Sequence, residues 1–210
     1  MKTCYIFGAA PISNYNDIQL QLGPEDIVIC ADGGSRHAAA CEIVPDWIVG
    51  DFDSSQMAID SSNIIRVKPE KDNTDMELAI NHGISLGYQN FVIYGALAGR
   101  FDHAMANIQM MASMIKRQIH ITLEDEQNRC WMIQNERVVL QKNQFPYVSV
   151  FSFSEYCYGV TLMGMKYPLT NYTLTNVSAG LSVSNEILGQ EASIEVQKGI
   201  LLIICSKDKK

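Results

Sequence analysis

Two aspartates, one residue apart, directly follow a short apolar segment that contains a tryptophan. The segment is Asp46–Val49, and the aspartates are Asp51 and Asp53. A run of Val, Ile and aromatic residues closed by a glycine predicts a buried strand, whose C-terminal end is where open α/β sheets bind ligands. Two nearby carboxylates repel each other unless a cation lies between them, and oxygen ligands suit Mg²⁺. An Asp-rich turn or a helix cap is the alternative interpretation of this pair.

Three further aspartates occupy equivalent positions between a predicted strand and a predicted helix. They are Asp32, Asp72 and Asp102. A parallel sheet gathers the C-terminal ends of its strands along one edge, so most of these carboxylates are expected to converge there. Arg100 ends a glycine-containing loop, where a guanidinium is a natural ligand for phosphate. Capping explains part of this pattern, and it leaves Asp72, which lies near two lysines, open to either interpretation.

Together these residues predict a site for Mg²⁺ and a polyphosphate. Phosphoryl-type transfer depends mainly on positioning and on neutralising charge, for which acidic residues that hold Mg²⁺ are the usual equipment. The residues alone therefore indicate a Mg²⁺-dependent enzyme that acts on a phosphoanhydride, and they leave its acceptor open. The sequence contains neither the G-x-G-x-x-G fingerprint nor the phosphate-binding pattern G-x-x-x-x-G-K-[ST].

Strands and helices are expected to alternate through the first part of the chain. The expected strands are Thr3–Phe7, Asp26–Ala31, Asp46–Val49, Ile64–Val67 and Phe91–Tyr94. The expected helices are Arg36–Cys41, a second one capped by Asn73 or Thr74, and a Met-rich third one over Arg100–Lys116. Glycines after Asp32 suit a turn that allows a backbone to approach a ligand closely.

After about residue 120 the pattern changes to short β-rich runs at regular spacing. Such a series predicts a small antiparallel sandwich or barrel. The runs are Ile119–Leu123, Arg129–Ile133, Val138–Leu140, Val148–Phe153, Gly159–Met163, Leu181–Val183, Ala192–Val196 and Ile200–Cys205. We place the boundary at the polar segment 124–128. The predicted fold class is α/β, with a mostly parallel-sheet domain over 1–125 followed by an antiparallel β-sandwich over 126–210.

Composition and charge exclude some classes of protein and indicate where the protein acts. The formal net charge of −7 argues against a nucleic-acid binder, which needs a basic surface. The six cysteines are scattered, as in a reduced cytosolic protein, and no apolar run approaches transmembrane length. The apolar stretch before Gly8 is too short for a signal peptide, so we expect a cytoplasmic protein with no membrane partner. His37, His82 and His120 are interpreted as ordinary surface or packing residues.

Six motifs in order make the chain recognisable. Asp32-Gly33-Gly34, Gly50-Asp51-Phe52-Asp53-Ser54, Lys71-Asp72-Asn73-Thr74-Asp75 and the segment from Gly99 to Asn107 resemble the thiamine pyrophosphokinase family. In the second half, the segments 164–169 and 180–186 are similar to the thiamine-binding domain of that family. The resemblance spans nearly the whole chain. It implies transfer of the pyrophosphoryl group of ATP to the hydroxyl of thiamine, which gives thiamine diphosphate and AMP.

The resemblance also implies roles for residues at the matching positions. An ATP-binding catalytic domain would come first, then a thiamine-binding domain, in a homodimer with thiamine held where the subunits meet. Asp51, Asp53 and Asp72 would hold Mg²⁺, and Asp72, Asp102 and Arg100 would be catalytic. The ATP-binding set would be Asp32, Gly33, Ser54, Thr74, Asp75, Arg100, Asp102 and Asn107. The thiamine-binding set would be Tyr167, Ser182, Ser184 and Asn185.

Three other functions stay open at this point. The same chemistry could serve another small alcohol, such as a hydroxymethylpterin. A non-catalytic module that binds thiamine or a nucleotide has no need for the complete acidic set. An interaction scaffold built on a β-sandwich gains nothing from Asp51 and Asp53.

Overall fold

We describe the protein from a computed structural model, which covers residues 2–18, 20, 22–50, 63–66, 74–178 and 180–209. The chain forms two compact units. The first comprises Met1–Met110 and Gln118–Glu126, and the second comprises Met111–Arg117 and Gln127–Lys210. Within the described ranges, no helix combines the length and the apolar character that crossing a membrane requires.

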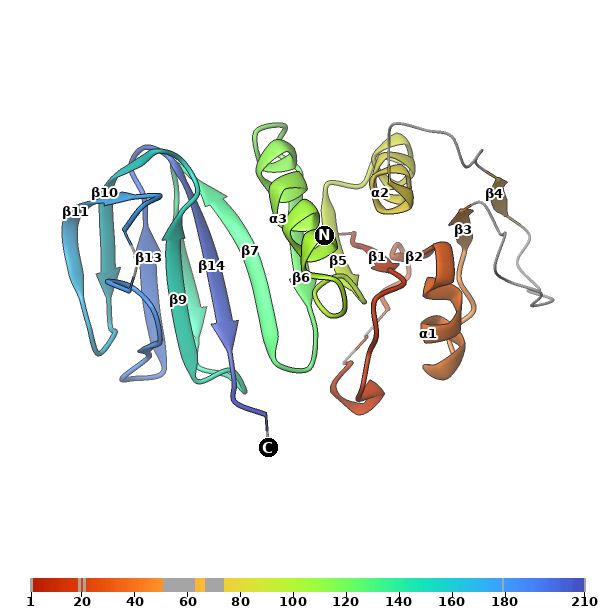
Figure 1. Ribbon diagram of the computed structural model, residues 1–210, viewed down its shortest axis with the longest axis horizontal. Coiled ribbons are helices and arrows are strands. Elements are labelled where there is room, and N and C mark those ends of the chain that lie inside the picture. The colour runs from red at the N-terminus through yellow and green to blue at the C-terminus, as the bar shows by residue number, and fades with distance from the viewer. Residues whose placement is uncertain are drawn as a thin grey trace. The chain divides into compact units, whose positions relative to one another are not determined.

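The first unit is built on a parallel sheet with the strand order β6-β5-β1-β2-β3-β4 (Figure 1). All five strand pairs in this order are parallel. The strands are β1 (Cys4–Phe7), β2 (Ile27–Ala31), β3 (Trp47–Gly50), β4 (Ile64–Arg66), β5 (Asn90–Tyr94) and β6 (His120–Glu124). The predicted parallel sheet is therefore confirmed. The run at 119–123 belongs to this sheet as β6 rather than to the antiparallel series with which it was grouped.

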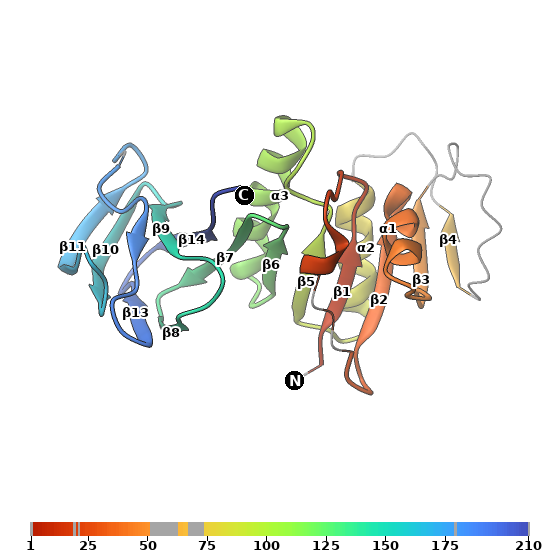
Figure 2. The same cartoon turned by 90° about the horizontal axis from the view of Figure 1, so that it is seen from below.

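Helices cover both faces of this sheet. The helical elements are η1 (Tyr15–Asp17), η2 (Asp32–Gly34), α1 (Ser35–Ala40), α2 (Asp75–Ser85) and α3 (Phe101–Ile115). Ala38 of α1 packs with Phe7 and Val28 on one face. Gly83 of α2 lies against Phe91 and Cys4, which point to the opposite face because side chains alternate along a strand. Figure 2 shows β5, β1, β2, β3 and β4 side by side.

Helix α2 begins with a capping box. The Thr74 side chain accepts a hydrogen bond from the backbone N–H of Glu77, and the Glu77 carboxylate accepts one from the Thr74 N–H. This arrangement satisfies two backbone donors that would otherwise lack partners at the helix start. Of the two caps that the sequence allowed, the structure has Thr74, whereas Asn73 lies outside the described residues.

The second unit is a β-sandwich. One sheet has the order β12-β9-β14-β7 within this unit, and the other has the order β11-β10-β13-β8. Ile133, Val150 and Ile203 of the first sheet share a buried core with Val160 and Ile194 of the second. The strands are β7 (Asn128–Gln134), β8 (Arg137–Gln141), β9 (Tyr147–Ser152), β10 (Tyr156–Met163), β11 (Leu169–Thr175), β12 (Asn185–Glu186), β13 (Glu191–Glu195) and β14 (Ile200–Ser206).

Two of the predicted details in this unit are wrong. Leu181–Val183, expected as a strand, forms a turn in which both Leu181 and Val183 are exposed, so no apolar face is buried there. The Thr-rich strand β11 was missed, because most of its side chains are exposed and its sequence lacks an apolar alternation.

The cysteines mostly lie in the two cores. All six are free, and only Cys41 is not fully buried. Burial raises the pKa of the Cys30 thiol to about 12 and that of Cys205 to about 11. These thiols therefore stay protonated near neutral pH and serve as small packing groups.

Gly34 allows α1 to lie directly against the end of β1. Its φ and ψ of −63° and −21° suit any residue, but an added Cβ would lie 1.9 Å from the carbonyl oxygen of Phe7. We expect Gly34→Ala to lower the free energy of unfolding by about 2 kcal/mol or more, because backbone must move to relieve the overlap.

The neighbouring glycine provides a matched control for this prediction. A Cβ at Gly33 would meet the Ala9 Cβ at 3.5 Å and the Arg36 Cζ at 4.0 Å, both ordinary contacts. Denaturant unfolding of both variants should show a large loss of stability for Gly34→Ala alone. Equal stabilities would contradict the steric explanation.

Candidate functional site

A cavity of about 570 Å³ lies where the strands of the first unit end. Its floor is formed by the residues that follow β1, β2 and β5, and its walls include the first residues of α2 and α3. The lining residues are Gly8, Ala9, Ala10, Ala31, Asp32, Thr74, Asp75, Met76, Gly95, Ala96, Asp102, His103, Ala106 and Asn107. The cavity is thus at the sheet edge where open α/β folds bind ligands.

The cavity brings together five of the residues that the sequence singled out. They are Asp32, Thr74, Asp75, Asp102 and Asn107. Gly33 follows Asp32 in the same 3₁₀ turn, and Arg100 immediately precedes α3. The remaining predicted residues of this end, Asp51, Asp53, Ser54 and Asp72, lie outside the described residues.

Asp32 and Asn107 are held by their local backbone. Asp32 has a φ of 48°, a left-handed conformation that Asp tolerates better than most residues, and this turns the chain sharply at the end of β2. The Asn107 side-chain amide donates to the carbonyl oxygen of Ala96 at 2.8 Å, which ties α3 to the loop after β5. Both residues therefore help to shape the cavity as well as line it.

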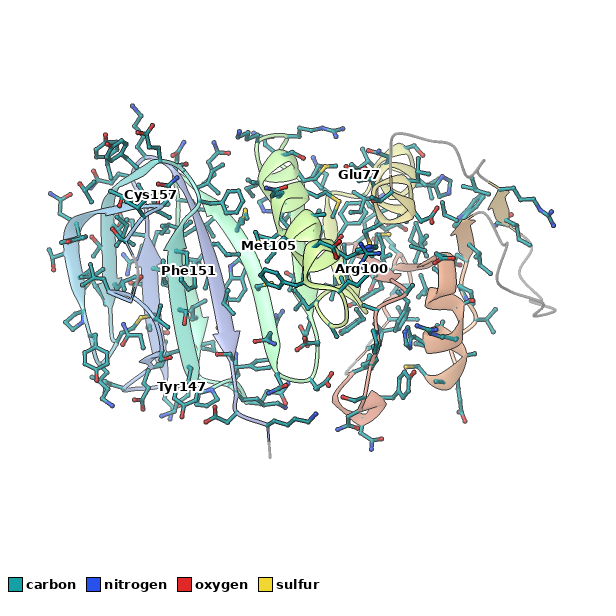
Figure 3. All side chains as sticks on the ribbon, viewed as in Figure 1. Glu77, Arg100, Met105, Tyr147, Phe151 and Cys157 are labelled. Carbon is teal, nitrogen blue, oxygen red and sulfur yellow. The ribbon has the colours of Figure 1, made fainter. Side chains whose placement is uncertain are left out.

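Arg100 and Asp102 form a two-pronged ion pair at the start of α3. The Arg100 Nε donates to Asp102 Oδ1 at 3.1 Å, and a terminal guanidinium nitrogen donates to Oδ2 at 2.5 Å. Asp102 Oδ1 also accepts from the His103 N–H at 3.0 Å. The hydrogen bond from Arg100 lowers the pKa of Asp102 to about 2, helped by the His103 N–H and opposed by desolvation. Figure 3 labels Arg100, which precedes α3, and Glu77, which lies in the first turn of α2.

Sequence reasoning missed the small residues of the cavity floor. Gly8, Ala9 and Ala10 after β1, and Gly95 after β5, contribute backbone and methyl groups rather than reactive side chains. The Gly95 φ of 65° and the 2.5 Å between a Cβ added there and the Gly8 carbonyl oxygen require glycine at this position. Small residues directly after two predicted strands were the available signal.

Of the predicted thiamine set in the second unit, Asn185 lies in β12, Ser182 and Ser184 lie in the turn before it, and Tyr167 lies between β10 and β11. Ser182 is buried, and its hydroxyl donates to the Val150 carbonyl oxygen. The Ser184 N–H donates to the Ser149 hydroxyl at 3.0 Å, and Ser184 has a left-handed φ of 55°.

Asn185 and Tyr167 are in direct contact through the Tyr167 backbone. The Asn185 Oδ1 accepts from the Tyr167 N–H at 2.9 Å, and its Nδ2 donates to the Tyr167 carbonyl at 2.7 Å. Asn185 is 1% exposed, whereas the Tyr167 ring is 56% exposed. A buried amide thus fixes the backbone that presents an exposed aromatic ring.

The carboxylates that border the cavity suit a hard cation. Asp32, Asp75 and Asp102 are oxygen donors of the kind that Mg²⁺ and Ca²⁺ prefer. Within the described residues, no three His, Cys, Asp or Glu side chains are grouped closely enough to hold a metal by themselves. The described carboxylates therefore have the donor type that a divalent cation prefers, but they do not form a complete metal site by themselves.

A parallel α/β unit with an acidic cavity at its strand ends, followed by a β-sandwich unit, is the two-domain α/β arrangement that the sequence predicted for a phosphotransfer enzyme. Comparison with known proteins identifies the family. Residues 19–123 match the model of the thiamin pyrophosphokinase catalytic domain, and residues 136–201 match that of the thiamin pyrophosphokinase vitamin B1 binding domain.

Several bacterial relatives match over nearly their whole length. A thiamine pyrophosphokinase from Bacillus subtilis (strain 168) is 32% identical over 216 residues, which covers 99% of this chain and 100% of the relative. A crystal structure of thiamine pyrophosphokinase from Bacillus subtilis superposes with a TM-score of 0.88 at 30% identity over 99% of this chain and 100% of that one. A crystal structure of thiamin pyrophosphokinase from Geobacillus thermodenitrificans superposes with a TM-score of 0.84 at 26% identity, over 100% of this chain and 99% of that one. The chain belongs to the thiamine pyrophosphokinase family.

The ion pair of α3 makes a prediction about titration. In the wild-type protein the Asp102 carboxyl should titrate with a pKa of about 2, and in Arg100→Gln its pKa should rise towards 3.8, because the largest cause of the shift is removed. Carbon-detected NMR of the labelled carboxyl measures both. Lys166→Gln, which breaks the separate ion pair with Glu186, is the control and should leave the pKa of Asp102 unchanged. An unchanged Asp102 pKa in the variant would refute the pairing.

Proposed function

We propose that this protein transfers the pyrophosphoryl group of ATP to the hydroxyl of thiamine, giving thiamine diphosphate and AMP. Membership of the thiamine pyrophosphokinase family defines it as a thiamine diphosphokinase. The observation that carries the assignment of the ATP end is the cavity, because it gathers Asp32, Asp75 and Asp102 at one sheet edge. ATP occupies this cavity, and its phosphates face the first turns of α2 and α3, where backbone dipoles favour negative charge.

The two substrates are divided between the two halves of the chain. Residues 1–125 form the ATP-binding domain and residues 126–210 the thiamine-binding domain, in line with the two family matches. Asp32, Gly33, Ser54, Thr74, Asp75 and Asn107 contribute to nucleotide binding together with Arg100 and Asp102. Tyr167 supplies an aromatic face for thiamine, with Ser182, Ser184 and Asn185 shaping its surroundings.

Kinases generally need a divalent cation, and Mg²⁺ is the one we assign here. Asp51, Asp53 and Asp72 would hold it, with Asp32 close by. When bound, the ion neutralises charge on the phosphate oxygens during transfer. The acidic character of the described cavity supports this, since carboxylates repel a polyphosphate unless a cation compensates for their charge.

The transfer itself is an in-line displacement. The thiamine hydroxyl oxygen forms a bond to the β-phosphorus of ATP. The bond between that phosphorus and the oxygen that bridges the α- and β-phosphates breaks, and AMP leaves with this oxygen. Arg100 neutralises developing charge on the phosphate oxygens. The hydroxyl proton passes to a carboxylate, either Asp72 or Asp102. The low pKa of Asp102 and its ion pair favour Asp72 as the acceptor and assign Asp102 to orienting Arg100.

No observation specifically favours the other enzymatic or binding functions. A hydroxymethylpterin alcohol would need a different acceptor site, whereas the match at 136–201 is to a vitamin B1 binding domain. The acidic cavity speaks against a module that only senses its ligand, because binding alone does not require carboxylates beside a polyphosphate. The protein is expected to act in the cytoplasm.

The decisive assay follows AMP and thiamine diphosphate together. With ATP, Mg²⁺ and thiamine we expect both products in equal amounts, no AMP without thiamine, and loss of turnover when the cation is chelated. Chromatography of one reaction measures them all. ADP in place of AMP would contradict pyrophosphoryl transfer. Activity with a pterin alcohol but not with thiamine would show that the acceptor is the pterin alcohol.

A single substitution provides the matched variant for this assay. Asp53→Asn keeps size and polarity and removes one negative charge, so the fold should persist while turnover is lost. Circular dichroism checks the fold. A turnover rate near that of the wild type would contradict the assignment of Asp53 to the metal site.

We further propose that the protein is a homodimer with its thiamine sites where the subunits meet. The outer face of the β8–β13–β10 sheet exposes Val139 and Met163, which are 54% and 57% accessible and both pair with Ser193. The stacked rings of Tyr156 and Tyr158, also exposed, lie at the other end of β10. Exposed large apolar groups gathered on one face are a feature of association surfaces.

Light scattering on a sizing column tests the assembly. We expect twice the mass of the chain for the wild type and a shift towards the monomer for Met163→Glu, because a charge placed on the apolar face opposes burial. Val177→Glu, which changes an 85% exposed residue of the turn that follows β11, is the control and should leave the mass unchanged. A monomeric wild type would refute the dimer.

A further inference from the structure

His37 is a buried histidine that the proposed chemistry does not use. It lies in α1, is 3% exposed, and uses both ring nitrogens in hydrogen bonds. Its Nδ1 lies 2.7 Å from the Tyr15 hydroxyl, and its Nε2 lies 2.9 Å from the carbonyl oxygen of Ala10. One side chain therefore connects α1, the 3₁₀ turn η1 and the loop that follows β1.

The partners of His37 determine its tautomer. A carbonyl oxygen can only accept, so the proton sits on Nε2 and is donated to Ala10, and Nδ1 accepts from the Tyr15 hydroxyl. The Arg36 Nε is 3.5 Å from the same Nε2, which in this tautomer is a contact between two N–H groups rather than a bond. Burial, followed by the charge of Arg36, lowers the pKa of His37, so the imidazole stays neutral.

The carbonyl that His37 holds belongs to the floor of the cavity. Gly8, Ala9 and Ala10 all line it. On the β5 side, the Gly8 N–H donates to the Tyr94 carbonyl at 2.8 Å and the Ala10 N–H to the Gly95 carbonyl at 3.0 Å. On the α1 side, Arg36 donates to the Ala9 carbonyl and His37 to the Ala10 carbonyl. The loop is thus fastened from two directions.

We propose that His37 is a positioning residue for the nucleotide, which fixes the Gly8–Ala10 floor through its bond to Ala10 while Tyr15 holds its ring in the donating tautomer. The inference rests on the proposed function, because it takes the cavity to be the ATP site. A floor made of backbone has no bulky side chain to define its surface, so its shape depends on what holds its carbonyls. His37 acts on ATP binding and leaves the thiamine end untouched.

Steady-state kinetics of three variants tests this role. In His37→Leu, which removes both hydrogen bonds, we expect the KM for ATP to rise about tenfold, with kcat and the KM for thiamine within about twofold of the wild type. His37→Gln can still donate an amide N–H to Ala10 and should restore most of the affinity. Tyr15→Phe loses only the bond that sets the tautomer, and a rise of about threefold is expected.

Tyr88→Phe is the matched control. The Tyr88 hydroxyl donates to the Glu25 carbonyl at 2.7 Å, also a bond from a side chain to a loop of the first unit, but both residues precede their strands and lie away from the cavity. Its loss should lower stability without changing the KM for ATP. Amide hydrogen exchange at Ala10 should quicken in His37→Leu and Tyr15→Phe and stay unchanged in Tyr88→Phe.

The outcomes separate the inference from the function on which it rests. A wild type that binds ATP without making AMP would refute the proposed function, and calorimetric ATP affinities of the same variants would still test His37. An unchanged KM for ATP in folded His37→Leu, or an equal rise in the KM for thiamine, would overturn the positioning role. If His37→Leu does not fold, His37→Gln and Tyr15→Phe test the positioning role instead. A Tyr15→Phe variant with wild-type ATP affinity and wild-type amide hydrogen exchange at Ala10 would refute that role.

Discussion

The close approach of Gly34 to the carbonyl oxygen of Phe7 is the contact on which the first unit depends. Two neighbouring parallel strands end at this point, and the chain after β2 must turn within the three residues of η2 to start α1 against β1. Asp32 makes the turn in a left-handed conformation, and Gly34 provides the space. Without this contact, the carboxylate of Asp32 and the floor after β1 would not share one cavity.

The charges around the cavity follow from the same geometry. Parallel strands end at one edge, so the residues that open α2 and α3 meet the residues that close β1, β2 and β5. Helix starts favour anions, whereas the carboxylates near them repel anions. If the cavity holds ATP, as we propose, the balance between the two makes the binding of its polyphosphate conditional on a cation, which a cavity lined by lysines would not require.

The sequence predicted the parts of this structure in which side-chain type carries the information. The order of strands and helices in the first unit, a helix cap at Asn73 or Thr74 and the gathering of Asp32 and Asp102 follow from periodicity, capping and the rule for strand ends. The floor at Gly8–Ala10 does not, because its contribution is backbone, and a sequence of small residues does not reveal which carbonyls will be held. His37 was interpreted as a packing residue because its partners, Tyr15 and Ala10, become its neighbours only in the folded sheet.

The errors in the second unit have a related physical origin. Leu181–Val183 looks like a strand by composition, yet its large side chains are exposed, and the turn is fixed by the bonds of Ser182 to Val150. Strand β11 is held by pairing with β10 rather than by apolar alternation of its own. For Asn185, which the family resemblance places in the thiamine set, both ends of the amide are used on the Tyr167 backbone, a contact that the sequence did not reveal.

The position of β1 has a consequence for how the chain reaches its native state. Although β1 is the first strand in the sequence, it lies inside the sheet, with Cys4 paired to Ile27 on one side and to Phe91 on the other. During synthesis, β1 and β2 can meet early, but the other edge of β1 stays open until β5 has left the ribosome. An apolar strand with an unpaired edge is prone to mispairing. The nascent chain therefore passes through an interval in which its central strand is protected only by chaperones or by the speed of translation.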